Sequence, residues 1–297
     1  MTPEILVTTV RIAVISNQSS FKYEKIRGSD MKKLNREELG KLGLYEFQGY
    51  IGAMTSPTFG GWKGTDRLIE LLNIKDMNRP KILEVGCATG YITRYIAEKF
   101  DCEITGIDLS EVLLEIARDK SEEQKLDNTK FEYASVEDLP FPDDTFDIVY
   151  GEAITALVSD PLKVLLEYKR VLKPGGRVAT VDLFMKESLS SEFLEETNEV
   201  MSNVIGTEVK IRDFKTWEQI FNDSGFNSIE LHDYYDDLFK RDYSTGETVK
   251  ITLNLFYHML TSSEVRRKIS PTMKFARKFQ EALNGGNFGY LIFTGVK

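Results

Sequence analysis

Residues 82–90 read Ile-Leu-Glu-Val-Gly-Cys-Ala-Thr-Gly, and this stretch decides the fold class. A short apolar run that ends at an acid and a glycine predicts a buried strand over 81–85, followed by a tight turn. Residues 91–100 carry apolar side chains at helical spacing, so a helix follows the turn. A second strand over 103–107 ends at Asp108, 22 residues after the first glycine of the turn. That separation is about what one strand–helix–strand crossover needs.

The alternation of strands and helices continues as far as residue 183. Beyond Asp108 the pattern predicts a helix, two strands, a helix and a strand, over 111–120, 130–134, 146–150, 160–172 and 177–183. Lys173-Pro174-Gly175-Gly176 predicts a turn before the last of these strands. Such βαβ units have right-handed crossovers, which place helices on both faces of a parallel sheet. The predicted fold class is therefore α/β with a mostly parallel sheet.

The regular alternation then ends. A helix is predicted over 187–204, and Thr216 begins a capping-box pattern for a helix that ends at Gly225. A strand over 228–234 and a final strand over 288–296 enclose a mostly helical stretch. We expect these helices to lie outside the regular alternating core.

The turn after the first strand predicts a nucleoside ligand. Small residues there let a ligand approach the backbone, and Asp108 at the end of the second strand can accept hydrogen bonds from two ribose hydroxyls. The dinucleotide pattern G-x-G-x-x-G is not met, because its third glycine position holds Tyr91. Glu84 would repel a pyrophosphate, whereas it suits a ligand with an ammonium and a sulfonium group.

Four sequence blocks in order carry a family resemblance. They are residues 83–90, 106–110, 137–147 and 171–176. With these blocks the chain resembles the class I S-adenosylmethionine (SAM)-dependent methyltransferases, especially the small-molecule group that includes the ubiquinone and menaquinone C-methyltransferases. The resemblance implies a Rossmann-like sheet of seven strands, mostly parallel with the last strand antiparallel, covered by helices on both faces and completed by a helical cap.

The resemblance also assigns residues to SAM. Those it implies are Glu84, Gly86, Cys87, Ala88, Gly90, Asp108, Leu109, Ser135, Val136, Glu137 and Gly151. It places Glu84 at the methionine end, Asp108 at the ribose and Leu109 against the adenine. Two positions depart from the family pattern: Ala88 replaces the middle glycine of the turn, and Ser135 stands where an adenine-binding Asp is frequent.

Four further residues are candidates for the site. Tyr50 belongs to an aromatic stretch that related enzymes fold over the cofactor, where a ring would attract the sulfonium, although packing on the core is an equal alternative. Gly61 would allow close approach to the methionine end. Glu152 follows the fourth strand, where ligands bind in open α/β sheets, and is a candidate general base. His258 lies among aromatic residues of the predicted cap and is a second catalytic candidate.

The predicted organisation has six segments. They are an N-terminal extension with lid helices (1–59), a SAM-binding Rossmann-like core (60–184), cap helices (185–224), a core strand (225–234), a helical cap insertion (235–287) and a final core strand (288–297). The cap would select the acceptor, and its aromatic residues, among them Trp217 and Phe221, favour a partly apolar small molecule.

Composition limits the partners. The chain has 38 Lys and Arg against 47 Asp and Glu, a net charge of −9, so nucleic acid is not an expected partner. Residues 261–297 are locally basic, which favours the solvated face of a cap helix over an RNA site. Two cysteines, Cys87 and Cys102, offer no disulfide framework or metal spacing, so we expect a cytoplasmic protein without a metal. No apolar run has the length of a membrane span.

The predicted function is methyl transfer from SAM to a small-molecule acceptor by in-line displacement. Three alternatives stay open at this point. They are a methyltransferase of RNA or protein, a nicotinamide-linked oxidoreductase, and a SAM-binding module without catalysis. The sequence leaves the oligomeric state open.

Overall fold

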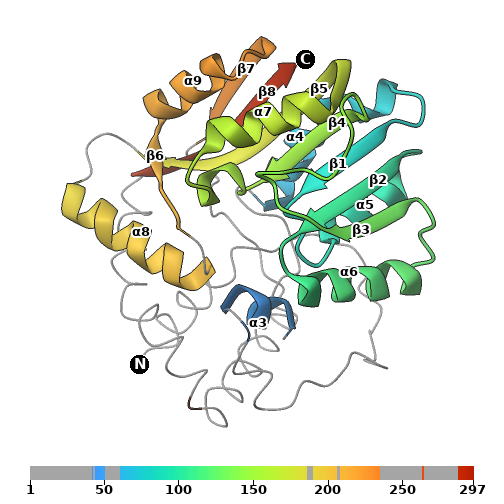
Figure 1. Cartoon of the computed structure of the whole chain (residues 1–297), viewed down its shortest axis with the longest axis horizontal. Coiled ribbons are helices and arrows are strands. Elements are labelled where there is room, and N and C mark those ends of the chain that lie inside the picture. The colour runs from blue at the N-terminus through green and yellow to red at the C-terminus, as the bar shows by residue number, and fades with distance from the viewer. Residues whose placement is uncertain are drawn as a thin grey trace.

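The computed structural model places one sheet at the centre of the chain, with helices packed on it (Figure 1). The residues described are Leu42, 44–50, 61–185, 190–205, 208–234, Ser263 and 287–297. Within the described part, no helix has both the length and the apolarity of a membrane span.

The strand order is β3-β2-β1-β4-β5-β8-β7, and the short β6 pairs with β5. The strands are β1 (Lys81–Val85), β2 (Glu103–Asp108), β3 (Thr129–Tyr133), β4 (Phe146–Glu152), β5 (Leu172–Met185), β6 (Arg212–Asp213), β7 (Asn227–Tyr234) and β8 (Phe288–Val296). β1 to β5 pair in parallel, whereas β8 runs antiparallel to both β5 and β7. The predicted α/β sheet with an antiparallel last strand is confirmed, and β6 is an addition that the sequence did not predict.

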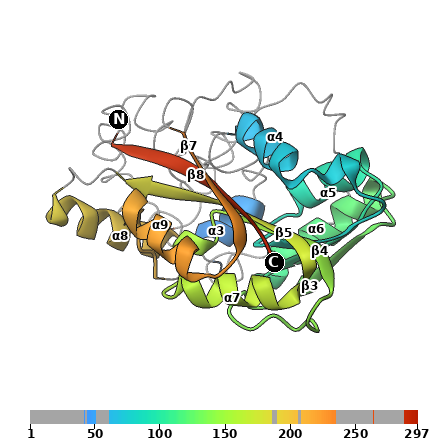
Figure 2. The same ribbon diagram turned by 90° about the horizontal axis from the view of Figure 1, so that it is seen from above.

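Helices cover the sheet as the crossover rule requires (Figure 2). They are α3 (Leu44–Tyr50), α4 (Gly61–Leu72), α5 (Tyr91–Lys99), α6 (Glu111–Glu123), α7 (Pro161–Val171), α8 (Ser191–Ile205) and α9 (Phe214–Asp223). The segment α3 lies beside α6 and α8, although it is far from both in sequence. Residues 44–50 therefore lie at the end of the sheet at which β2 stops.

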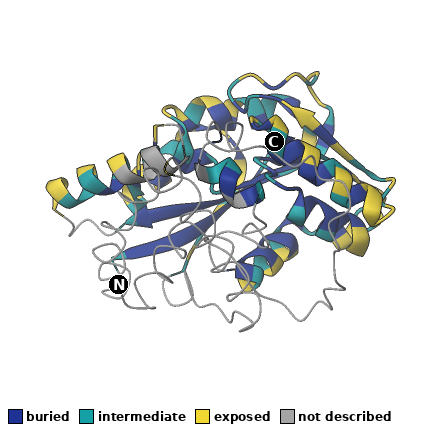
Figure 3. Cartoon of the chain, turned by 90° about the horizontal axis from the view of Figure 1, so that it is seen from below, coloured by how far each residue is buried: buried dark blue, intermediate teal, exposed yellow. Residues whose placement is uncertain are grey.

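Alternation along the strands builds two apolar cores, one on each face of the sheet. Buried residues accordingly predominate along the central strands (Figure 3). On β1, Ile82 faces the core under α4 and α5, and its neighbour Leu83 faces the core under α7 and α9. Trp217 and Phe221 of α9 are fully buried, and the Phe221 ring stacks on Phe293 of β8 with centroids 4.0 Å apart. These two aromatic residues therefore stabilise the sheet and give no information about an acceptor.

Two local predictions differ from the structure. The stretch 173–176 lies inside β5, where the pairing with β4 slips and Gly175 takes a φ of +77°, so the predicted turn is an irregularity within a strand. Thr216 does not begin α9. The carboxylate of Asp213 caps this helix by accepting the N–H of Thr216 at 2.6 Å. The helix starts there because β6 ends at Asp213 after pairing with β5.

Candidate cofactor-binding site

The candidate site lies where the strand order reverses. β1 lies between β2 and β4 and pairs in parallel with both. The carboxyl ends of these three strands therefore meet at one edge of the sheet. In open α/β sheets this switch point is where ligands bind. The turn after β1, Asp108 at the end of β2 and Glu152 at the end of β4 are thereby brought together.

The turn after β1 needs unusual backbone conformations. Gly86, Ala88 and Gly90 have φ values of +74°, +49° and +67°. A Cβ on Gly90 would lie 2.5 Å from the Phe131 ring and 2.8 Å from the Cβ of Ala117. Glycine is therefore required at position 90 by both conformation and space. Ala88 adopts the left-handed region with a side chain, which carries a strain on the order of 1 kcal/mol.

Four N–H groups of this turn are bonded within the protein. Those of Gly86 and Cys87 donate to the carbonyl of Ile107 at 2.8 and 2.9 Å, and that of Gly90 donates to the carbonyl of Cys87 at 2.7 Å. The N–H of Ala88 donates to a carboxylate oxygen of Asp108 at 2.9 Å. A phosphate-binding loop presents free N–H groups to its ligand. The four bonded N–H groups of this turn are therefore not free to cradle a pyrophosphate.

Asp108 is held rigidly at the end of β2. Its second oxygen accepts the N–H of Ser110 at 2.9 Å. The hydroxyl of Ser110 caps α6 and donates to Glu46 of α3 at 2.7 Å, which links the N-terminal segment to the site. Burial raises the pKa of Asp108, and the backbone bonds partly offset that rise. Each carboxylate oxygen has two lone-pair directions, so Asp108 can still accept bonds from ribose hydroxyls.

Two buried carboxyl groups flank the turn. Glu84 is 4% exposed and accepts a hydrogen bond from the hydroxyl of Thr93. Burial raises the pKa of Glu84 to about 8, a rise that the Thr93 bond opposes and the nearby Glu152 carboxylate reinforces. Glu152 is also buried and accepts from the hydroxyl of Thr65 on α4 at 3.2 Å. A positively charged group bound beside these two acids would favour their ionised forms, so this part of the site is suited to a cation.

The raised pKa of Glu84 predicts how the stability of the ligand-free protein depends on pH. In the unfolded chain Glu84 releases its proton near its ordinary pKa of 4.5, whereas the folded protein keeps it until about pH 8. The folded state binds more protons in this window, so the free energy of unfolding falls as pH rises. The slope from one such group is at most about 1.4 kcal/mol per pH unit.

Urea unfolding at several pH values between about 5 and 8 measures this slope. Buried Asp108 and Asp182 contribute with the same sign, so the informative comparison is between wild type and Glu84→Gln, which cannot ionise. We expect a shallower decline in the variant. Equal slopes in the two proteins would show that Glu84 ionises normally.

The structure places the other predicted residues at the same edge, with differing exposure. Val136 and Gly151 are buried, and Leu109 is 60% exposed beside Asp108. The hydroxyl of Ser135 accepts the N–H of Glu137 at 3.3 Å, and the Glu137 carboxylate lies 3.7 Å from the ammonium of Lys163. The strand ends thus bring these residues near one another, while their contacts with a cofactor remain predictions.

The remaining predicted residues occupy varied positions. The Cys87 thiol is buried in a small cluster with Leu114 and Phe131, and burial raises its pKa. Tyr50 ends α3 and is half-buried, and Gly61 begins α4 with a φ of +56°. The catalytic candidate His258 lies outside the described residues.

Sequence reasoning missed several partners of the site. Thr65 and Thr93 hold the two glutamates, and Glu46 holds Ser110. Tyr45 of α3 lies close enough to Asp108, Cys87 and Glu84 for their charges to add to the rise in its pKa that burial causes. The sequence carried no signal for these partners, because threonines are common in helices and nothing in the sequence indicates which of them face a buried acid.

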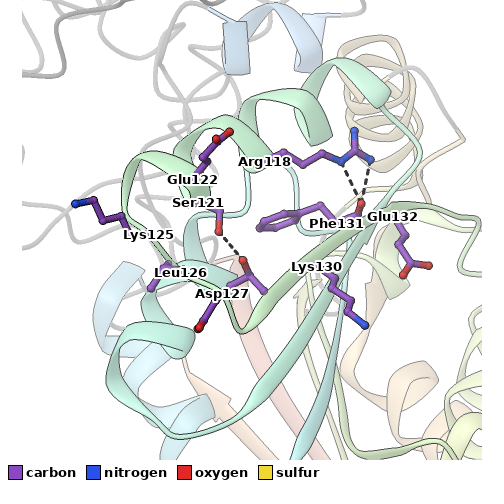
Figure 4. A pocket seen from close by; sticks show the side chains of 10 residues that line it. Arg118, Ser121, Glu122, Lys125, Leu126, Asp127, Lys130, Phe131 and Glu132 are labelled. Carbon is purple, nitrogen blue, oxygen red and sulfur yellow. Dashed lines mark hydrogen bonds between the residues drawn. The ribbon is translucent and has the colours of Figure 1, made fainter.

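A separate surface depression of about 610 Å³ lies between α6 and β3 (Figure 4). Arg118 donates there to the carbonyl of Phe131, and Ser121 and Thr129 share a hydrogen bond. These polar groups form hydrogen bonds with one another. Acidic and basic side chains alternate in sequence among the residues that line the depression. Within the described ranges, no three His, Cys, Asp or Glu side chains are grouped to hold a metal.

Comparison with known proteins agrees with this geometry. Residues 78–241, more than half of the chain, match the methyltransferase domain family. Phosphoethanolamine N-methyltransferase 1 of Triticum aestivum is 25% identical over 239 residues, which cover 79% of this chain and 46% of the wheat protein. The chain thus spans about half the length of this curated relative.

Two solved structures have the same fold. The [4+2]-cyclase SpnF superposes with a TM-score of 0.67 at 19% identity, covering 88% of this chain and 96% of that one. Phosphoethanolamine N-methyltransferase 2 of Haemonchus contortus, solved with phosphomonomethylethanolamine and S-adenosylhomocysteine, superposes with a TM-score of 0.62 at 19% identity and covers 85% and 57%. At 19% identity the two structures show only that the fold is shared. The family match, the sheet order and the acid-flanked turn together show that the chain belongs to the class I SAM-dependent methyltransferase domain family.

Proposed function

We propose that this protein transfers the methyl group of SAM to a small-molecule acceptor. The observation that carries the proposal is the placing of Glu84, Asp108 and Glu152 around one turn at the switch point of the sheet. The two glutamates and the aspartate come from three different strands, so they meet only through the fold.

The residues present fit SAM. Buried acids beside the turn suit its ammonium and sulfonium charges, and Asp108 offers acceptors for its ribose hydroxyls. The internally bonded N–H groups of the turn and the acid at position 84 fit a pyrophosphate poorly, which argues against the nicotinamide alternative. When bound, SAM would supply a methyl group that a nucleophile attacks in line with the bond to the positively charged sulfur, with S-adenosylhomocysteine as the leaving group.

The protein would contribute alignment and exclusion of water. Asp108 fixes the ribose end, because both of its oxygens are already oriented by backbone bonds. Glu84 holds the charged methionine end. Glu152, held by Thr65, would orient the acceptor or remove its proton. The segment α3, tied to the site through Glu46 and Ser110, would shield the reaction from water.

The acceptor class is proposed from the relatives. The wheat and Haemonchus proteins are named for methylation of phosphoethanolamine, a small amine. We propose a small molecule of this size, recognised by the predicted cap over 235–287. A partly apolar small molecule, like the acceptors of the ubiquinone and menaquinone group, is the alternative acceptor.

Two buried free thiols, Cys87 and Cys102, support the predicted cytoplasmic location.

Calorimetry with SAM and S-adenosylhomocysteine, followed by transfer of tritiated methyl groups, tests the function. We expect both ligands to bind and label to appear in a small acceptor such as phosphoethanolamine, with much less label from an Asp108→Ala control at the same SAM concentration. Total RNA and total protein serve as competing acceptors. Absence of binding by either ligand would overturn the proposal, and label confined to RNA or protein would overturn its acceptor class.

A further inference from the structure

The carboxylate of Asp182 on β5 lies fully buried beneath the segment that leaves β4. One of its oxygens accepts the N–H of Ala156 at 2.9 Å, and the other accepts the hydroxyl of Thr155. Removing a carboxylate from water is costly unless hydrogen bonds replace its hydration. Asp182 lies outside the four family-like sequence blocks, and its two bonds reach a neighbouring part of the candidate site.

The segment 153–159, which these bonds hold, is fixed at both ends as well. At its start, the N–H of Ala153 donates to the carbonyl of Val181 at 2.6 Å. At its end, the guanidinium of Arg212 lies 3.4 Å from the carbonyl oxygens of Val158 and Ser159. Ala153 has a φ of +60°, a strained conformation for alanine that persists only where the surroundings impose it. The segment therefore has one imposed path, and Asp182 anchors its middle.

Ile154 connects this segment to the turn after β1. A Cβ placed on Gly86 would lie 2.0 Å from Cδ1 of Ile154, so this side chain packs directly on the glycine. Ile154 is flanked by Ala153, bonded to β5, and by Thr155, bonded to Asp182. A continuous set of contacts thus runs from Asp182 through Thr155 and Ile154 to Gly86.

We propose that Asp182 is a positioning residue for SAM binding, which acts by holding Ile154 against the glycine turn. The inference rests on the proposed function, because it takes the turn as the place where SAM binds. Asp182 itself would not touch the cofactor. Its removal would take away the anchor at the middle of the segment, so Ile154 would no longer be held against the turn.

A double-mutant cycle measured by calorimetry with SAM tests this. Asp182→Ala is expected to weaken SAM binding about 10-fold, since it removes two buried hydrogen bonds that fix the segment. Ile154→Ala is expected to weaken it to a similar degree. The double variant should lose little more than either single variant, because the two residues act through one contact. Asp182→Asn keeps the shape and an acceptor oxygen, so it should restore binding to within about 3-fold of wild type.

Controls separate this role from general stability. Ser224→Ala removes a buried hydroxyl bonded to the carbonyl of Phe221 at the end of α9, so it should lower stability and leave SAM affinity unchanged. If Asp182→Ala fails to fold, Thr155→Val removes one of the two bonds. It should weaken binding about 3-fold in wild type and leave it unchanged in the Ile154→Ala background.

The outcomes distinguish the two proposals. If wild-type protein binds neither SAM nor S-adenosylhomocysteine, the proposed function fails. If wild type binds SAM and folded Asp182→Ala binds it equally well, only the positioning role fails. Additive losses in the double variant would also overturn the positioning role, since they would show that Asp182 and Ile154 act separately.

Discussion

Replacing Asp108 with alanine is expected to weaken SAM binding about 100-fold, or about 3 kcal/mol. Under the proposed function the carboxylate has two roles in this site. It offers acceptors to the ribose hydroxyls, and it accepts the N–H groups of Ala88 and Ser110, which shape the turn and the start of α6. Alanine removes both sets of bonds and leaves two backbone donors at the site without their acceptor. Titration calorimetry with SAM measures the effect.

Asp160 supplies a matched control for that variant. Its carboxylate also accepts a backbone N–H, that of Lys163 at 3.1 Å, where it caps α7. Asp160→Ala should cost about 1 kcal/mol of stability, as a lost helix cap does, with SAM affinity unchanged. Asp108→Asn keeps the size of the side chain but removes its charge and one of its two acceptors, because the amide nitrogen would face a backbone N–H. An Asp108→Ala protein that binds SAM within about 3-fold of wild type would remove Asp108 from the binding site.

Gly90→Ala is expected to destabilise the protein by about 3 kcal/mol. The substitution forces a side chain into a left-handed backbone conformation, at about 1 kcal/mol. It also drives a methyl group against the Phe131 ring and the Cβ of Ala117, both closer than 3 Å. Overpacking of this kind typically costs a further ~1–3 kcal/mol. Urea unfolding of the ligand-free protein measures the sum.

Gly175 separates the two contributions. It has a φ of +77°, yet a Cβ there would meet nothing within 4 Å. Gly175→Ala should therefore lose only the conformational part, about 1 kcal/mol. Equal losses in the two variants would mean that the packing around Gly90 relaxes, and that space at the turn does not select glycine.

The sequence alone determined the sheet and the place of the site. Apolar runs of strand length alternating with helical patterns predicted β1 to β5, because the strand and helix periods are local properties. The same runs predicted that Glu84, Asp108 and Glu152 would share one edge, since parallel strands end on the same side. The predictions failed where local signals compete, as at Thr216, whose capping pattern lost to the pairing of β6 with β5.

Only the tertiary structure decided which side chains hold these acids. Thr65 reaches Glu152 across 87 positions of sequence, and Ser110 reaches Glu46 across 64. Asp182 bonds Thr155 because β5 lies next to β4, a neighbour relation set by the order of the sheet. Hydrogen bonds between distant elements depend on distances of a few ångströms, which packing fixes and local periodicity does not encode. The sequence therefore predicts where a charged cofactor would bind, and the packed sheet supplies the groups that hold the candidate binding residues in place.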